Sequence, residues 1–228
     1  MMVEKFDREL IPDAPDLRFE IDLWAQGLQV VAGIDEAGRG ALAGPVTAAA
    51  LVLPADPNLS RLLTGVRDSK QMTPDQRSLW AARLRQRALG FGIGFASHQE
   101  IDTFGIVPAT RLAMQRALAG LPQAPHHLLI DYVDIPEVAI PQTCLVKGDA
   151  RSLSIAGASI LAKTARDDLL RQLDGQYPGY GFAANKGYGT QAHRDALARL
   201  GLSPVHRRSF RVKNLDVYLE DIDGPASS

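Results

Sequence analysis

The feature that most constrains this chain is a set of short apolar segments that each end in an acidic residue. Residues 30–35 form an apolar run that closes on Asp35 and Glu36, and residues 128–130 form a fully apolar run followed by Asp131. Runs this short and this apolar are typical of buried strands. We therefore expect carboxylates to gather where neighbouring strands of one sheet end.

Other segments alternate between strand and helix character. Residues 45–53 and 91–96 favour strands, and residues 144–146 are another short candidate. Thr73 and Gln76 are spaced as in a capping box, with a proline between them, and predict the start of a helix. The predicted helices cover residues 73–89, 108–119, 152–173 and 190–200, and each is followed closely by a glycine.

This order of elements predicts an α/β chain with a mixed five-stranded sheet flanked by helices and a helical C-terminal appendage. Residues 1–28 are mixed in composition and are expected to form a lead-in. We expect residues 29–175 to form the main domain and residues 176–228 to form a helical region and tail. A length of 228 residues agrees with one compact domain and an appendage.

The composition excludes several classes of protein. Hydrophobic residues are 46% and charged residues 22%, which argues against disorder, collagen-like repeats and coiled coil. The longest apolar run, residues 48–54, is far shorter than the ~18 residues of a membrane span. The first ten residues are not typical of a signal peptide. The single cysteine, Cys144, is expected in the core and cannot form an internal disulfide, so we expect a cytoplasmic location.

The net charge of −1 hides an uneven distribution. Residues 141–215 carry 12 Lys and Arg against 5 Asp, a net charge of +7. The rest of the chain carries 13 basic and 21 acidic residues, a net charge of −8. A basic third beside an acidic remainder is compatible with a polyanion bound along one side, and equally with a solvated basic surface. Charge alone leaves both interpretations open.

The acids at the strand ends suggest a metal site. Asp35, Glu36, Asp131 and Asp149 would repel one another if gathered, and divalent cations between them would relieve this repulsion. Oxygen ligands without His or Cys favour Mg²⁺ or Mn²⁺ over zinc. Two such ions ~4 Å apart can stabilise the attacking and leaving oxygens in phosphodiester cleavage. Taken singly, each acid is more often a cap or a solvated residue, and Asp149 could cap the helix predicted over residues 152–173.

Adjacent residues on a strand point to opposite faces, which limits how the first acidic pair can act. Asp35 and Glu36 cannot both offer carboxylates to one site from a regular strand. Either the strand has ended by Glu36, or the backbone carbonyl of Glu36 takes part.

A series of motifs resembles the type II ribonuclease H family. Residues 34–40, Ile-Asp-Glu-Ala-Gly-Arg-Gly, are similar to the family's D-E-x-G-R-G motif. The resemblance extends, in order, over roughly residues 29–212. It continues through residues 68–70, 113–117, 129–131 and 146–149, from Ser154 to Asp167, and through residues 185–190 and 206–210.

The resemblance implies a ribonuclease H-like fold and an endonuclease that hydrolyses RNA paired to DNA. It also implies cleavage 5′ of single ribonucleotides embedded in duplex DNA, leaving 3′-hydroxyl and 5′-phosphate ends. Ribonucleotide excision and RNA primer removal are the implied duties, and a monomer without a membrane partner is expected. The catalytic and metal-binding residues would be Asp35, Glu36, Asp131 and Asp149, with two Mg²⁺ or Mn²⁺ ions in the substrate complex.

The resemblance also implies nucleic-acid contacts. The segment Gly38, Arg39 and Gly40 would read the ribose 2′-hydroxyl at the RNA–DNA junction, and glycines allow the main chain to approach a sugar closely. Tyr188 would stack on the adjacent deoxyribose. The lysines expected to contact backbone phosphates, without reading sequence, are Lys70 and Lys186.

Three positions depart from the family pattern. Tyr132 stands where Gly is usual, and Gly189 and Ala41 stand where Pro is common. None of them removes a metal ligand. Asp167 is expected to be structural because it lies far along its predicted helix, and His206 is expected to be a helper on the basic surface.

Two alternatives remain open at this point. One is the type III relative, which shares the fold but carries an extra N-terminal substrate-binding domain, for which the roughly 28 residues before the first predicted strand are too few. The other is a protein that binds hybrids without cleaving them, against which the presence of all four acids argues. A metal-dependent cleavage assay separates the second alternative from an enzyme.

Overall fold

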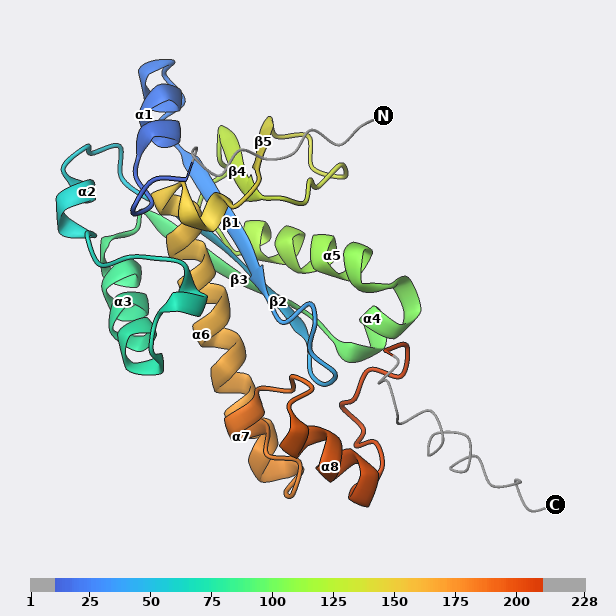
Figure 1. Ribbon diagram of the computed structural model, residues 1–228. Coiled ribbons are helices and arrows are strands. Elements are labelled where there is room, and N and C mark those ends of the chain that lie inside the picture. The colour runs from blue at the N-terminus through green and yellow to red at the C-terminus, as the bar shows by residue number, and fades with distance from the viewer. Residues whose placement is uncertain (1–10, 211–228) are drawn as a thin grey trace.

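The computed structural model describes residues 11–210; residues 1–10 of the expected lead-in and residues 211–228 of the expected tail lie outside the described residues. One five-stranded sheet, in the order β3-β2-β1-β4-β5, runs through the centre (Figure 1). β1 pairs with β2 and β2 with β3 in antiparallel fashion, whereas β1–β4 and β4–β5 are parallel. The mixed five-stranded sheet predicted from the sequence is therefore confirmed. The strands are β1 (Val31–Ala37), β2 (Val46–Val52), β3 (Gly90–Ala96), β4 (His127–Asp131) and β5 (Gln142–Leu145).

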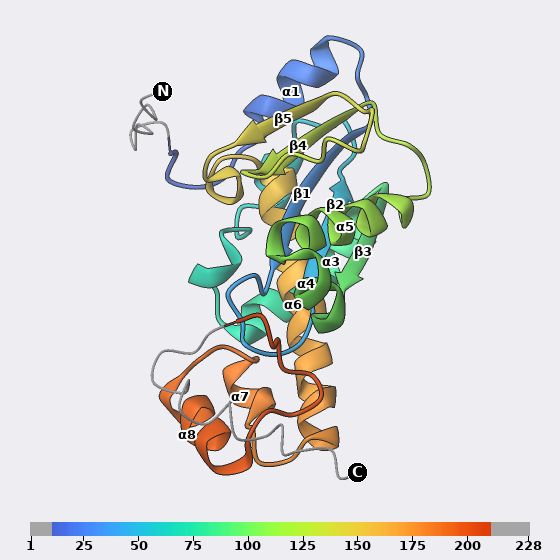
Figure 2. The same cartoon turned by 90° about the vertical axis from the view of Figure 1, so that its right-hand side faces the viewer.

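Helices cover both faces of the sheet and continue beyond one of its ends (Figures 1 and 2). The helix predicted from residue 73 begins with the expected capping box, in which Thr73 and Gln76 each bond the other's backbone. The α-helices are α1 (Arg18–Ala25), α2 (Leu59–Leu62), α3 (Pro74–Arg87), α4 (His98–Phe104), α5 (Ile106–Ala119), α6 (Leu153–Gln176), α7 (Phe182–Asn185) and α8 (Gln191–Leu200), and short 3₁₀ helices are η2 (Ser69–Gln71) and η3 (Gly148–Ala150).

Alternate residues of β1 pack into two separate hydrophobic cores. Val31 packs in the cluster with α6, α3 and α1, whereas Ala32 and Ile34 pack in the cluster with α5 on the other face. Gly33 lies where α6 approaches closest, because a Cβ there would lie 2.2 Å from the Ser154 backbone. This close approach brings the first turn of α6 against β1.

The length of α6 explains the C-terminal appendage. Its 24 residues span ~36 Å, whereas a seven-residue strand spans ~23 Å, so α6 extends past the sheet. Beyond the sheet, Leu170 of α6 packs with Phe182 and Leu197 in a third core that α7 and α8 complete. Figure 2 shows these helices below the sheet, on the overhanging half of α6.

The expected lead-in contains helix α1, whose Glu20 and Trp24 are buried. One expectation from the sequence is wrong. Cys144 is exposed rather than in the core, because β5 is an edge strand with only one neighbour. Within residues 11–210, no helix has the length and apolar character that crossing a membrane requires.

Candidate active site

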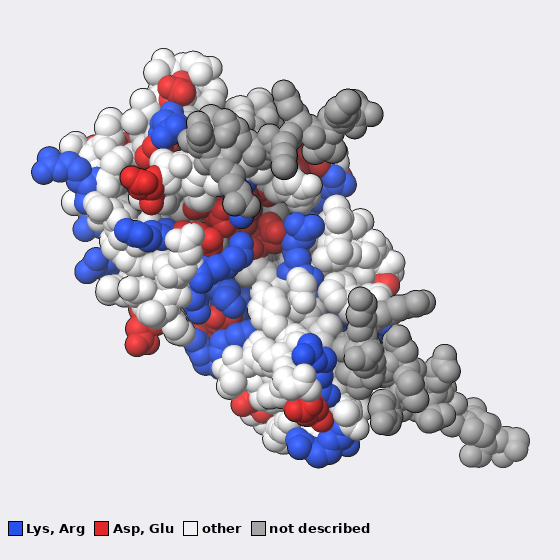
Figure 3. All heavy atoms as spheres, in the orientation of Figure 1, with Lys and Arg blue, Asp and Glu red and all other residues white. Residues whose placement is uncertain are grey.

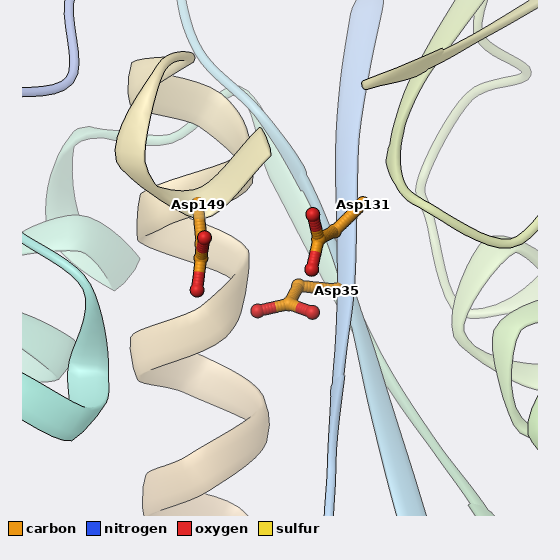
Figure 4. Close-up of side chains that lie close together, drawn as sticks. All are labelled: Asp35, Asp131 and Asp149. Carbon is orange, nitrogen blue, oxygen red and sulfur yellow. The ribbon is translucent and has the colours of Figure 1, made fainter. Parts of the chain in front are cut away.

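Three aspartates meet at the end of the central strands. β1 and β4 are parallel and in register at Ile34 and Ile130, so the next residue on each strand, Asp35 and Asp131, reaches the same edge. Asp149 comes from η3, directly before α6. One carboxylate oxygen from each of the three lies within 4.8 Å of the others. Figure 4 shows the carboxylates of this aspartate cluster (Asp35, Asp131, Asp149) pointing toward one another.

Asp35 is the most deeply buried member of the cluster. Burial, followed by the charges of Glu36, Asp131 and Asp149, raises the pKa of Asp35 well above its ordinary value. Its Oδ1 accepts the backbone N–H of Glu36 at 2.7 Å, and the Ser159 hydroxyl on α6 also donates to it. These neutral donors offset only part of the cost of burying a charge.

The other two aspartates are fixed through the turn before α6. Asp131 Oδ1 accepts the Gly148 N–H at 2.7 Å, and burial together with the Asp149 charge raises the pKa of Asp131 to about 6. Burial also raises the pKa of Asp149, whose Oδ2 lies 3.5 Å from the Lys70 ammonium. Ser152, not Asp149, caps α6, so the capping alternative for Asp149 is excluded.

Glu36 lies beside the cluster rather than in it. β1 continues to Ala37, so the strand has not ended at Glu36. Its N–H donates to the Asp35 carboxylate at 2.7 Å. The Glu36 side chain lies 3.3 Å from Arg39, and its Oε2 is buried without a hydrogen-bond partner among the described residues. Burial raises the pKa of this carboxyl. Because β1 continues through Glu36, the alternative in which the strand has ended by Glu36 is excluded.

Basic residues line the same cleft as the acids. Figure 3 shows acidic atoms in a central hollow with Lys and Arg beside and below them. Lys70 and Lys163 both belong to the lining, and Lys163 Nζ lies 5.4 Å from the centre of the Tyr188 ring. Lys163 was not among the residues predicted from the sequence, although it lies within the stretch from Ser154 to Asp167 that resembles the family. In the structure it is ion-paired with Asp167. The described lining consists of Asp35, Glu36, Ala37, Gly38, Arg39, Gly40, Ser69, Lys70, Asp131, Lys163 and Tyr188.

Two buried arginines hold the glycine–arginine segment (Gly38, Arg39, Gly40) in place. Arg207 donates to the carbonyls of Gly38 at 2.7 Å and of Arg39 at 2.8 Å. Gly38 has φ +93° and packs against Arg166, whose Nε would lie 1.9 Å from an added Cβ, so only glycine fits there. Sequence reasoning missed both arginines, because nothing in a basic segment marks which members are buried.

The C-terminal core fixes Tyr188 through two buried histidines. His206 Nδ1 accepts the Ser203 N–H at 2.9 Å, so a neutral His206 carries its proton on Nε2 and donates to His193 Nε2 at 3.0 Å. His193 Nδ1 then donates to the Tyr188 carbonyl at 3.0 Å. Burial lowers the pKa of His206 to about 4. The expectation that His206 acts on the basic surface is therefore wrong.

Two residues named from the sequence lie differently from the rest. Lys186 is outside the cleft lining, and its Nζ donates to the Ala183 carbonyl. Tyr132 is 67% exposed with φ +64°, the left-handed region that glycine favours, which explains why glycine suits this position. Asp167 pairs with Arg77 and Lys163 and so has the structural role expected for it.

The aspartate cluster fits divalent cations. Two buried carboxylates and one half-buried carboxylate, all with raised pKa values, lie within reach of one ion. Among the described residues, the only cationic side chain paired with any of them is Lys70, at the long distance of 3.5 Å. The orphaned Glu36 Oε2 adds a further oxygen beside them. Oxygen donors of this kind suit Mg²⁺ and Mn²⁺.

Comparisons with known proteins agree with this site. The family model of ribonuclease HII matches residues 32–213. A ribonuclease HII from Synechococcus sp. is 58% identical over 86% of this chain and 88% of its own length. The solved ribonuclease H2 from Pyrococcus horikoshii is 26% identical, covers 80% of this chain and 94% of its own, and superposes with a TM-score of 0.68.

A third protein, Bst-RNase HIII solved in complex with Mn²⁺, shares the fold at 19% identity and a TM-score of 0.56, over 79% of this chain and 66% of its own. The family match, the 58% identical relative and the shared fold give one result. The chain belongs to the ribonuclease HII family, the metal-dependent endonucleases that degrade the RNA of RNA–DNA hybrids.

Proposed function

We propose that this enzyme cuts on the 5′ side of single ribonucleotides embedded in duplex DNA, as well as within hybrids, and leaves 3′-hydroxyl and 5′-phosphate ends. The observation that carries the proposal is that Asp35 and Asp131 of the aspartate cluster line one cleft with the glycine–arginine segment and Tyr188. A sugar held at that segment would present its neighbouring phosphate to the carboxylates. Ribonucleotide excision and RNA primer removal are the duties we infer from this activity.

We propose that Asp35, Glu36, Asp131 and Asp149 hold two Mg²⁺ or Mn²⁺ ions when substrate is bound. Such ions, when bound, would stabilise the attacking and leaving oxygens of the phosphodiester. The protein's part is to keep the carboxylates close together and able to ionise when cations bind. The Gly148 N–H fixes the Asp131 carboxylate, and the Glu36 N–H and the Ser159 hydroxyl fix Asp35.

Recognition of the ribonucleotide would rest on the main chain of the glycine–arginine segment. Arg207 holds the Gly38 and Arg39 carbonyls from behind, so these groups are already in position before substrate arrives. The 2′-hydroxyl both donates and accepts hydrogen bonds, and it is the group that distinguishes RNA from DNA at one position. Tyr188 would lie against the next sugar, and its ring lies close to Lys163 and Arg166.

Phosphate contacts would come from the lysines of the cleft. We propose Lys70 and Lys163 as the contacts nearest the aspartate cluster, because both belong to the lining. Lys186 would act farther out, since it lies outside that lining. We propose that residues 29–175 form the catalytic domain and residues 176–228 the substrate-binding region. Residues 211–228 of that region are outside the described residues. We propose a cytoplasmic monomer.

Cleavage mapping tests the proposal directly. Wild type and Tyr188→Ala are compared under single-turnover conditions on a DNA duplex with one ribonucleotide and on a continuous hybrid. We expect wild type to cut once, 5′ of the ribonucleotide, and Tyr188→Ala to be slowed up to ~100-fold on that substrate, because the scissile phosphate is misplaced. Tyr132→Ala, an exposed tyrosine outside the cleft lining, is the matched control and should cut normally. Equal rates for Tyr188→Ala and wild type on both substrates would remove the role of Tyr188.

Binding without cation-dependent cleavage by the wild type would favour the non-catalytic alternative.

A salt titration of duplex binding distinguishes residues that bind phosphates by charge from residues that contact the sugar by shape. Lys70→Ala should lower the slope of log affinity against log salt by about one unit, whereas Tyr188→Ala should leave it unchanged. An unchanged slope for Lys70→Ala would show that Lys70 does not contact phosphate.

A further inference from the structure

The first backbone amides of α6 donate hydrogen bonds to residues that precede the part of the chain matched by the family model. Helix N-termini leave their first amides without partners inside the helix. Here the Leu153 N–H bonds the Asp16 carbonyl at 2.8 Å, and the Ser154 N–H bonds Glu20 Oε1 at 2.9 Å. The family match begins at residue 32, so both acceptors come from the chain before it.

Glu20 makes the strongest part of this connection. Its Oε1 accepts the hydroxyls of Ser152 and Ser154, each at 2.6 Å, in addition to the Ser154 N–H. Glu20 is 1% exposed, although it belongs to a short helix at the edge of the fold. Burial raises the pKa of this carboxyl, while the serine bonds act against that rise. A carboxylate at the positive end of a 24-residue helix is also favoured electrostatically.

The bonds continue from Glu20 into the aspartate cluster. Ser152, held by Glu20, donates its N–H to the Gly148 carbonyl at 2.8 Å. Gly148 in turn donates its own N–H to the Asp131 carboxylate at 2.7 Å. Asp149 lies between Gly148 and Ser152 in this turn, so one hydrogen-bonded path from Glu20 reaches two of the three aspartates.

The turn that carries Asp149 also has bonds of its own, because the Ala150 N–H donates to the Lys147 carbonyl and the Arg151 N–H to the Gly148 carbonyl, each at 3.0 Å. Asp16 pairs with Ser152 in an isolated β-bridge, which ties the same turn to the chain before α1. Lys147, at its start, has φ +59°, a strained conformation for a residue with a side chain. Asp149 therefore lies in a turn that begins with a strained residue, and its carboxylate is close to those of Asp35 and Asp131.

We propose that Glu20 is a positioning residue of the aspartate cluster, and that divalent cation affinity depends on its hold on the turn from Gly148 to Ser152. The inference rests on the proposed use of the cluster as a cation site. It gives helix α1 a role in the reaction although no atom of α1 belongs to the cleft lining.

Calorimetric titration of the metal-free full-length protein with MnCl₂ tests the inference. We expect Glu20→Ala to raise the dissociation constant for Mn²⁺ about tenfold, as is typical when a group that orients a metal ligand is removed. Glu20→Gln keeps an oxygen acceptor for the serines and should fall between Glu20→Ala and wild type. The matched control is Trp24→Leu, which weakens the packing of the same helix without touching the turn. It should lower the melting temperature and leave the Mn²⁺ affinity unchanged.

Amide hydrogen exchange without any cation gives a second readout. The Gly148 and Ser154 amides should exchange faster in both Glu20 variants than in Trp24→Leu. Wild-type Mn²⁺ affinity and wild-type exchange in a folded Glu20→Ala protein would overturn the inference; if that protein does not fold, the same result in Glu20→Gln overturns it. If the wild type takes up no Mn²⁺, the proposed cation site fails instead, and exchange still decides whether Glu20 holds the turn.

Discussion

Two regions of this molecule each bury side chains of like charge, but the chain gives these side chains different partners. The aspartate cluster gathers three carboxylates within 4.8 Å, with neutral donors and one distant lysine as partners. The arginine pair (Arg166, Arg207), at the junction of sheet and C-terminal region, is also buried. Each arginine donates to three backbone carbonyls.

The two regions differ in how well the chain itself satisfies the buried groups. The N–H donors of the arginine pair are satisfied by carbonyls of residues 38–45 and of Lys186, and the pair holds the cleft wall. Burial still lowers the pKa of both arginines, that of Arg207 to about 9. The aspartates have raised pKa values because they are buried and, second, because other carboxylates lie close to them. A buried charge that its own chain leaves uncompensated is typical of a functional site.

The largest expected effect comes from neutralising the cluster. Asp35→Asn keeps the size of the side chain and removes the charge that would hold cations. Cation chemistry supplies several kcal/mol to such reactions, so we expect the single-turnover cleavage rate to fall by roughly 1,000-fold or more. Circular dichroism should be unchanged. Asp75→Asn, an exposed acid on α3, is the control, and substantial cation-dependent activity in Asp35→Asn would refute its assignment.

Removing an arginine should act on stability instead. Arg207→Met leaves the carbonyls of Gly38, Arg39 and Gly44 without their donor, and we expect unfolding to become easier by about 3 kcal/mol or more. Arg208→Met is the neighbouring control, because Arg208 is exposed, and should stay within about 0.5 kcal/mol. Denaturant melts measure both. Equal melts would mean that the buried arginine does not hold the segment.

The smallest effect is a gain in stability. Asp131 has its pKa raised from 3.8 to about 6, so the folded state binds this proton more tightly than the unfolded state does. The stability of the metal-free wild type should therefore fall as the pH rises from about 4 through about 6. Asp131→Asn lacks this loss and should be more stable by about 1–2 kcal/mol at pH 7 and equal to wild type at pH 4. Thermal melts across this range would contradict the account if the variant were less stable at pH 7.

The sequence predicted the parts of the site that depend on local patterns. Short apolar runs located β1 and β4, and their parallel pairing placed Asp35 and Asp131 together, as expected for strand ends. The capping box at Thr73 is likewise a local feature and appeared as predicted.

Features that depend on tertiary contacts were missed or mistaken. Helix α1 is short, and its buried Glu20 is explained only by serines 132 and 134 residues away. Arg166 and Arg207 look like any surface arginine until the carbonyls around them are known. Cys144 looked like a core residue because the edge position of β5 follows from strand order, which no local pattern encodes.

The most direct test is whether divalent cations stabilise the fold through the aspartate cluster. Melting temperatures of metal-free wild type and of an Asp35→Asn, Asp131→Asn double variant are measured with and without millimolar Mn²⁺. At a cation concentration ~100 times the dissociation constant, wild type should gain about 2.7 kcal/mol, and its melting temperature should rise by several degrees. The double variant should show no rise. An equal rise in both proteins would show that the ions bind elsewhere and would contradict the account.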